Sequence, residues 1–136
     1  GCMTETNLQK SETVIARILD FLLELGLQDG SSLAFEDLDI PDDHHDIFNG
    51  CCIWLLEEGI IRCTNHSQAN IGGVMLFNPM ITSNGFALLD KPLVIRDQKI
   101  SVGQAVKEIA RGNRNYAGIG DFFGGFLGGF TKSMGS

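Results

Sequence analysis

The hydrophobic residues in the first half of the chain recur at helical spacing in two places. The first predicted helix is capped by Ser11 and ends at Gly26. The second begins at Pro41, because proline is tolerated in a first helical turn, and runs to about Glu57, with one short helical turn before it at Phe35–Leu38. The apolar positions are Val14, Ile15, Ile18, Leu19, Leu22 and Leu25 in the first helix and Ile47, Phe48, Cys51, Cys52 and Leu55 in the second.

After the second helix the apolar pattern becomes strand-like. Two short apolar runs, Ile60–Thr64 and Val74–Phe77, predict strands that flank a polar loop over 65–73. Together they predict a β-hairpin. Pro79 indicates that the second strand ends there or lies at a sheet edge, since proline cannot donate a backbone hydrogen bond.

Two more helices are predicted from their capping residues. Thr82 is placed to cap a short helix that runs through Leu89. Ser101 and Gln104 form the pattern of a capping box, and Gly112 closes the helix that follows. The apolar face of that last helix consists of Val102, Ala105, Val106, Ile109 and Ala110.

The C-terminal segment has the most unusual pattern, because aromatic and glycine pairs alternate with a period of four. Wound as a helix, it places Phe122, Phe123, Phe126, Leu127 and Phe130 on one face and glycines on the other. The apolar face gains burial only against a second surface, whereas glycines disfavour the isolated helix. We therefore predict folding on contact rather than an idle extension. The predicted partner-binding residues are Gly120, Phe122, Phe123, Gly124, Phe126, Leu127, Gly128 and Phe130.

The order of helix, short helix, helix, hairpin and helix over about residues 11–90 resembles the winged helix-turn-helix superfamily. The resemblance rests on Phe35-Glu-Asp-Leu-Asp-Ile-Pro41 followed by Trp54-Leu-Leu-Glu-Glu-Gly-Ile-Ile-Arg62, and on Ile81-Thr-Ser-Asn-Gly-Phe-Ala-Leu-Leu89. It implies an α+β fold in which a winged-helix domain of three helices and a β-hairpin wing precedes C-terminal helices and a Gly/Phe-rich tail. The predicted divisions are a winged-helix-like domain over 3–92, a connector and amphipathic helix over 93–111, and an association tail over 112–136.

The same resemblance raises the question of DNA binding. In DNA-binding members of the superfamily the second helix of the motif places its N-terminal residues on the bases, and basic residues contact phosphates. Here that helix start carries Asp42, Asp43 and Asp46, which would repel phosphates and remove the gain from counterion release. If DNA is bound nevertheless, the residues expected to face it are His44, His45, Asn49 and Arg62.

Charge is unevenly distributed along the chain, whose formal net charge is −7. Residues 1–90 hold 3 basic and 14 acidic side chains, whereas residues 91–136 hold 7 basic and 3 acidic ones. An acidic body disfavours non-specific nucleic-acid binding. The basic C-terminal third can instead be attracted to the acidic body of its own chain or of a neighbour.

The residues that could carry chemistry do not form a recognised motif. Cys2 precedes Met3, which we take as the start, and the remaining odd set of Cys51, Cys52 and Cys63 suits a reducing cytoplasm rather than a disulfide framework. These cysteines, with His44, His45 and His66, lack the spacing of a zinc site. We therefore predict no catalytic residues, no metal and no cofactor.

These observations predict a non-enzymatic cytoplasmic regulator or adaptor that works through protein contacts and forms a homo-oligomer. A DNA-binding transcriptional regulator is one alternative, and a peripheral membrane binder that uses the aromatic tail is another. A membrane span is not expected, because the ten residues between Asp121 and Lys132 would make only about 15 Å of helix.

Overall fold

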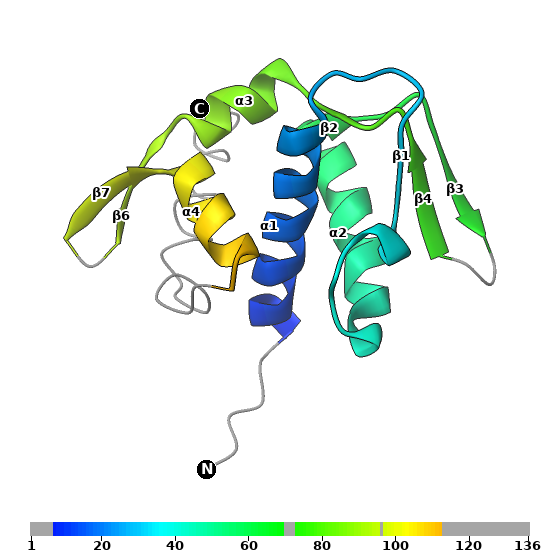
Figure 1. The fold of residues 1–136 in the computed structure, drawn as a ribbon, viewed down its shortest axis with the longest axis horizontal. Coiled ribbons are helices and arrows are strands. Elements are labelled where there is room, and N and C mark those ends of the chain that lie inside the picture. Colours follow the sequence, from blue (N-terminus) through cyan, green and yellow to red (C-terminus); the bar gives the residue numbers. More distant parts are fainter. Residues whose placement is uncertain (1–6, 70–72, 96, 113–136) are drawn as a thin grey trace, which may run out of the picture.

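The computed structural model describes residues 7–69, 73–95 and 97–112, and these form an α+β fold (Figure 1). The predicted partner-binding residues from Gly120 to Phe130 lie outside the described residues. The helices are α1 (Asn7–Leu25), α2 (His45–Glu57), α3 (Ser83–Leu89) and α4 (Val102–Ala110), with 3-10 turns η1 (Phe35–Asp37) and η2 (Asp42–His44). The strands are β1 (Ser32–Ala34), β2 (Ile61–Arg62), β3 (Asn65–Ala69), β4 (Gly73–Phe77), β5 (Met80–Ile81), β6 (Pro92–Ile95) and β7 (Gln98–Ser101).

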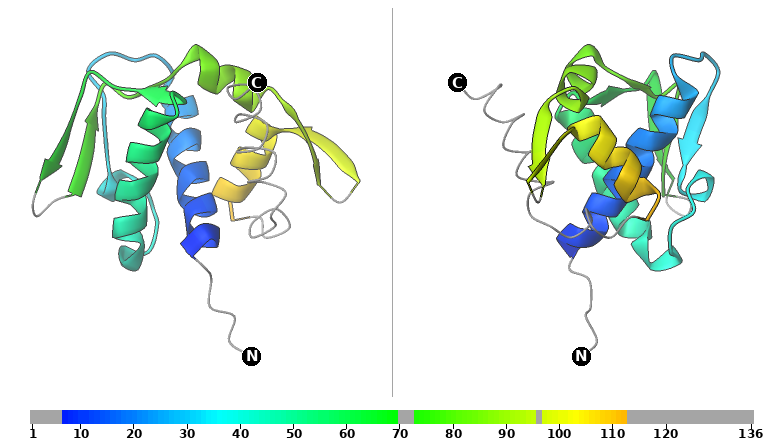
Figure 2. Two further views of the ribbon diagram at one scale, coloured as in Figure 1. Left: turned by 180° about the vertical axis from the view of Figure 1, so that it is seen from behind. Right: turned by 60° about the vertical axis from the view of Figure 1, so that its left-hand side comes forward.

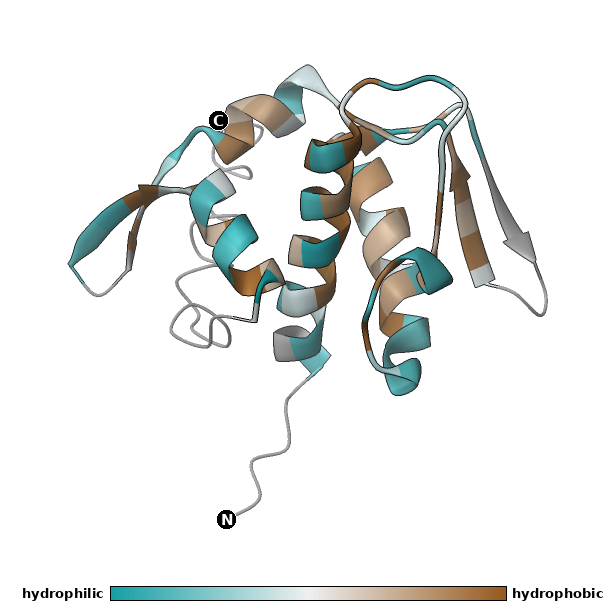
Figure 3. Ribbon diagram, in the orientation of Figure 1, coloured by the Kyte–Doolittle hydropathy of each residue, from teal (hydrophilic) through white to brown (hydrophobic). Residues whose placement is uncertain are grey.

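Helix α1 forms the centre of the molecule, with α2 packed on one side and α4 on the other (Figure 1). Its hydrophobic residues gather towards α2, as the colouring in Figure 3 shows. The predicted apolar face of α4, from Val102 to Ala110, is buried in the same cluster as the apolar residues of α1 and α2. The helix that the sequence analysis grouped with a connector is therefore part of one continuous hydrophobic core.

Most helix ends follow the sequence signals. Gly26 and Gly59 have φ values of 68° and 75°, a left-handed conformation that glycine adopts without strain. The hydroxyls of Thr82 and Ser101 accept hydrogen bonds from the amides of Gly85 and Gln104, at 2.9 and 3.0 Å. These contacts confirm Thr82 and Ser101 as the N-caps of α3 and α4. The Gln104 side chain, predicted to complete a capping box, donates instead to Glu108, at 3.2 Å.

The predicted start of α1 is wrong, because the helix begins at Asn7 and contains Ser11 within it. The Ser11 hydroxyl donates to the carbonyl oxygen of Asn7, at 2.7 Å. A serine within a helix can donate its hydroxyl hydrogen to the carbonyl oxygen four residues earlier, instead of capping the helix start. The first turn, Asn7 to Lys10, has only one apolar residue, Leu8, and so gave no periodic signal.

The predicted hairpin pairing is also wrong. Strand β4 pairs with β3 on one side and β1 on the other, giving a three-stranded sheet in the order β1-β4-β3. Ile61 and Arg62 in β2 pair instead with Ile81 and Met80 in β5. The sequence of β3 is polar, so this strand gave no apolar periodicity. Its pairing uses backbone groups that every residue carries.

A second hairpin, β6–β7, connects α3 to α4 and was not predicted. It extends on the opposite side of the helices from β3–β4, as Figures 1 and 2 show. Pro92 pairs with Ser101 at its base and Ile95 with Gln98 at its tip. Its attachment includes a hydrogen bond from the Val102 amide to the Lys91 carbonyl, at 2.9 Å.

Candidate functional site

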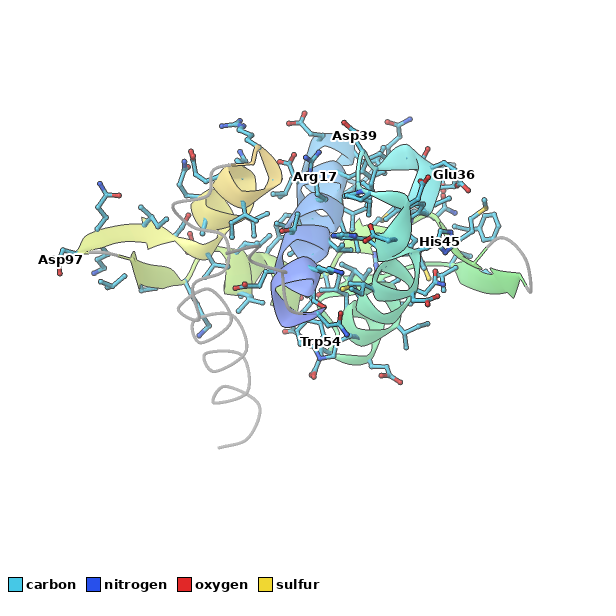
Figure 4. All side chains as sticks on the ribbon, turned by 90° about the horizontal axis from the view of Figure 1, so that it is seen from below. Arg17, Glu36, Asp39, His45, Trp54 and Asp97 are labelled. Atoms are coloured by element: carbon cyan, nitrogen blue, oxygen red, sulfur yellow. The ribbon has the colours of Figure 1, made fainter. Side chains whose placement is uncertain are left out.

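The start of α2 and the turns before it form an acidic surface. Figure 4 labels Glu36, Asp39 and His45 in this region. Asp97, at the tip of the β6–β7 hairpin, lies far from Glu36 in the same view. Asp42, Asp43 and Asp46 are exposed here. The carboxylate of Asp43 accepts a hydrogen bond from Nδ1 of buried His44, at 2.9 Å, which is the main reason that its pKa lies below the usual value. Lys10 lies 4.0 Å from the same carboxylate.

Three of the four residues considered as DNA-facing hold the protein together instead of pointing freely to solvent. His44 is buried beside Asp43. The ring of His45 packs on Phe35, with ring centroids 4.4 Å apart. The side-chain oxygen of Asn49 accepts from the Val74 amide, at 3.0 Å, and so joins α2 to β4.

Gly73 allows this close approach of β4 to α2. It has a φ of 77°, and a Cβ there would lie 2.6 Å from the His45 ring and 2.9 Å from the Asn49 oxygen. The first residue of β4 is therefore suited to glycine for both conformation and space. Together, His45, Asn49 and Gly73 fix the β3–β4 hairpin against α2.

Arg62, the fourth of these residues, is exposed on β2. It lines a cavity of about 230 Å³ with Asp29, Cys63, Thr64, Asn78 and Met80. The cavity lies where β2, β5 and the loop before β1 meet. Arg62 is the only basic side chain among its described lining residues, so this position alone offers little attraction for a nucleic-acid backbone.

The outward face of β4 is an apolar surface that the sequence analysis did not identify. Val74 and Leu76 point into the core, whereas the side chains of Met75 and Phe77 are 37% and 39% exposed. Ser32 and Asn65 flank Phe77 on the neighbouring strands. The continuous apolar run of β4 predicted a strand. It did not indicate that Met75 and Phe77 face solvent, because the outward positions of such a sheet are usually polar.

The cysteines lie in or beside the core. Burial raises the pKa of Cys51 to about 12 and also raises the pKa values of Cys52 and Cys63. Burial therefore favours the protonated form of these thiols, which is the less nucleophilic one. In the part of the chain that the structure describes, no three His, Cys, Asp or Glu residues come together in a way that could hold a metal ion.

The described helices include none that is both long and apolar enough to cross a membrane. Comparison with known proteins finds no matching family model, no matching curated protein and no matching solved structure.

Proposed function

We propose that this protein is a non-enzymatic regulator or adaptor that self-associates through its body and docks its C-terminal tail on a partner. The observation that carries the proposal is the outward face of β4, where Met75 and Phe77 stand exposed on a sheet. Large apolar side chains that share one face mark contact surfaces more often than isolated ones do. Aromatic residues and methionine are also enriched at protein interfaces.

The scaffold in this proposal is a winged helix. Its support is the order of the elements, in which α1, the short turn η1, α2 and the β3–β4 hairpin follow one another along the chain. The hairpin takes the place of the wing, and α3 is the capped helix after it. The tight packing of α3 also fits, because a Cβ at Gly85 would overlap the Ile60 carbonyl and lie 2.7 Å from Ile81.

The acidic surface supports protein binding over DNA binding. In a DNA complex, the start of α2 would bring Asp42, Asp43 and Asp46 close to the phosphates. The negative carboxylates and the negative phosphates would repel each other. His45 and Asn49 would have to leave their contacts with Phe35 and β4 to reach a base. Both effects lower the affinity for DNA, and neither opposes contact with another protein.

Light scattering on the full chain tests the self-association. We expect a mass above that of the monomer, and we expect Phe77→Ser to lower it because the substitution removes apolar area from the outward face of β4. Leu27→Ser is the matched control, since Leu27 is 67% exposed and lies in the loop between α1 and β1, outside strand β4. A monomeric wild type, or equal masses for all three chains, would contradict this part of the proposal.

The tail and the DNA alternative are tested separately. Phe126→Ser should weaken partner binding if the apolar face of the tail makes the contact, without changing the folded body. A salt titration with duplex DNA should show only weak binding that disappears as salt rises. Tight, sequence-selective binding that is lost in Arg62→Gln would favour a DNA-binding regulator instead.

A further inference from the structure

We propose that a groove between α1, α3 and α4 binds a phenylalanine side chain from the segment 122–130 of the same chain. This inference rests on the proposed function only in treating the tail as a docking segment. It adds a site on the body and an occupant for it. Docking within one chain would keep the aromatic face of the tail covered until a partner displaces it.

The groove has a volume of about 280 Å³ and lies at the first turn of α4. Its apolar lining residues are Leu23, Phe86 and Leu89, and its polar ones are Asp90, Ser101, Gln104 and Lys107. Phe86 is 44% exposed, whereas Leu88 and Leu89 on the same helix are buried. A cavity of about 150 Å³ suffices for a benzene ring, so this groove has room for a phenyl side chain.

Gly103 lets the first turn of α4 approach α3 closely at the edge of the groove. It lines the groove in the first turn of α4, and a Cβ at this position would lie 3.2 Å from the Leu89 carbonyl oxygen and 3.6 Å from the Leu89 Cβ. Glycine therefore suits the close packing of the two helices at the groove wall. An apolar wall with a polar rim around it suits an aromatic side chain.

The length of the chain after α4 allows this docking. Residues 113–121 separate Gly112 from the first phenylalanine of the segment, and nine residues span up to about 30 Å. The groove lies at the beginning of α4, whose nine residues are about 14 Å long, so the segment can return to it without strain. A short tether also gives an effective concentration of about a millimolar, which favours the chain's own segment over that of a second copy.

Charge favours the same pairing. Residues 113–136 contain Arg114, Lys132 and Asp121 and carry a net charge of +1, whereas residues 1–112 carry −8. Asp121 and Lys132 flank the phenylalanines, and the groove rim offers Lys107 and Asp90. Asp121 of the segment can therefore lie near Lys107 of the rim, and Lys132 near Asp90.

Limited proteolysis of the full chain tests the proposal, because chymotrypsin cuts after exposed phenylalanines. Mass spectrometry would follow cleavage between residues 122 and 130. Phe86→Ser should speed this cleavage about tenfold, the effect of losing one good apolar contact. Leu27→Ser is the control that removes a more exposed apolar side chain outside the groove, and it should cleave at the wild-type rate.

A second variant guards against a general loss of stability in Phe86→Ser. Lys107→Glu reverses a charge on the groove rim, and Lys99→Glu makes the same change on exposed β7. We expect faster tail cleavage in Lys107→Glu than in Lys99→Glu. Equal rates for wild type, Phe86→Ser and Lys107→Glu would overturn the proposal, whatever mass light scattering records.

Protein concentration distinguishes the occupants. Docking within one chain predicts a wild-type cleavage rate that stays constant over about a hundredfold range of protein concentration. Protection that increases with concentration would assign the groove to the tail of a second copy and overturn docking within the chain.

Discussion

The two hairpins of this protein have the same local form and very different surroundings. In β3–β4, the strand β4 also pairs with β1, buries Val74 and Leu76, and is held to α2 through Asn49. The hairpin β6–β7 has two short strands and no third strand among the described residues. Its Val94 is 60% exposed, and its contacts with the body include Ile100 and the bond at Lys91.

This difference indicates that a hairpin is stabilised mainly by contacts with the rest of the protein. A two-stranded hairpin alone is at best marginally stable in water, because few apolar groups are covered. The β3–β4 hairpin gains a third strand and a helix, whereas β6–β7 depends on its two ends, which continue from α3 and into α4. We therefore expect substitutions in the first hairpin to affect the whole fold and those in the second to have small effects.

The largest expected effect comes from removing a buried side chain of β4. Leu76→Ala should lower the free energy of unfolding by about 3 kcal/mol, because Leu76 is fully buried and its removal leaves a cavity. Val94→Ala in β6 should change it by less than about 0.5 kcal/mol. Urea unfolding of both variants checks the pair, and similar losses would show that the two hairpins are equally supported.

A smaller effect is expected at the contact between α2 and β4. Asn49→Ala removes the side-chain acceptor of the Val74 amide, and we expect a loss of about 1–2 kcal/mol. Asn84→Ala on the exposed side of α3 is the matched control, with an expected change within about 0.5 kcal/mol. Thermal unfolding compares them, and a neutral Asn49→Ala would mean that water replaces the amide contact.

The smallest expected effect on stability depends on pH and comes from Asp43, in the turn just before α2. The hydrogen bond from His44 lowers the pKa of Asp43 below its usual 3.8 in the folded protein, so the carboxylate stabilises the fold above about pH 4. That contribution is lost as the pH falls through the lowered pKa. Asp43→Asn should therefore melt slightly below wild type near neutral pH and match it in strong acid. A difference that grows in acid would contradict the assignment.

The sequence predicted helices better than strand pairing, for a reason that individual residues show. Thr82 and Ser101 each bond an amide three residues away, so their role is visible in a few neighbouring letters. The partners of β4 lie at Ser32–Ala34 and Asn65–Ala69, and neither segment has an apolar alternation. Of the candidate site residues, His45 and Asn49 were placed correctly on α2, but the direction of their side chains depended on where β4 lies.

The sequence alone determined the extent of α4, the end of α2 at Glu57, the glycines and hydroxyls that end or begin helices, and the apolar faces that are buried. These features follow from local sterics and from a periodicity repeated over a few turns. The predicted start of the second helix at Pro41 is wrong, because the 3-10 turn η2 occupies Asp42–His44 and α2 begins at His45. Only the tertiary structure decided which strands pair, that Phe77 and Phe86 reach the surface, and that α4 joins the core of α1. Strand pairing uses backbone groups common to all residues, and exposure depends on what packs nearby, so both are set by contacts between distant parts of the chain.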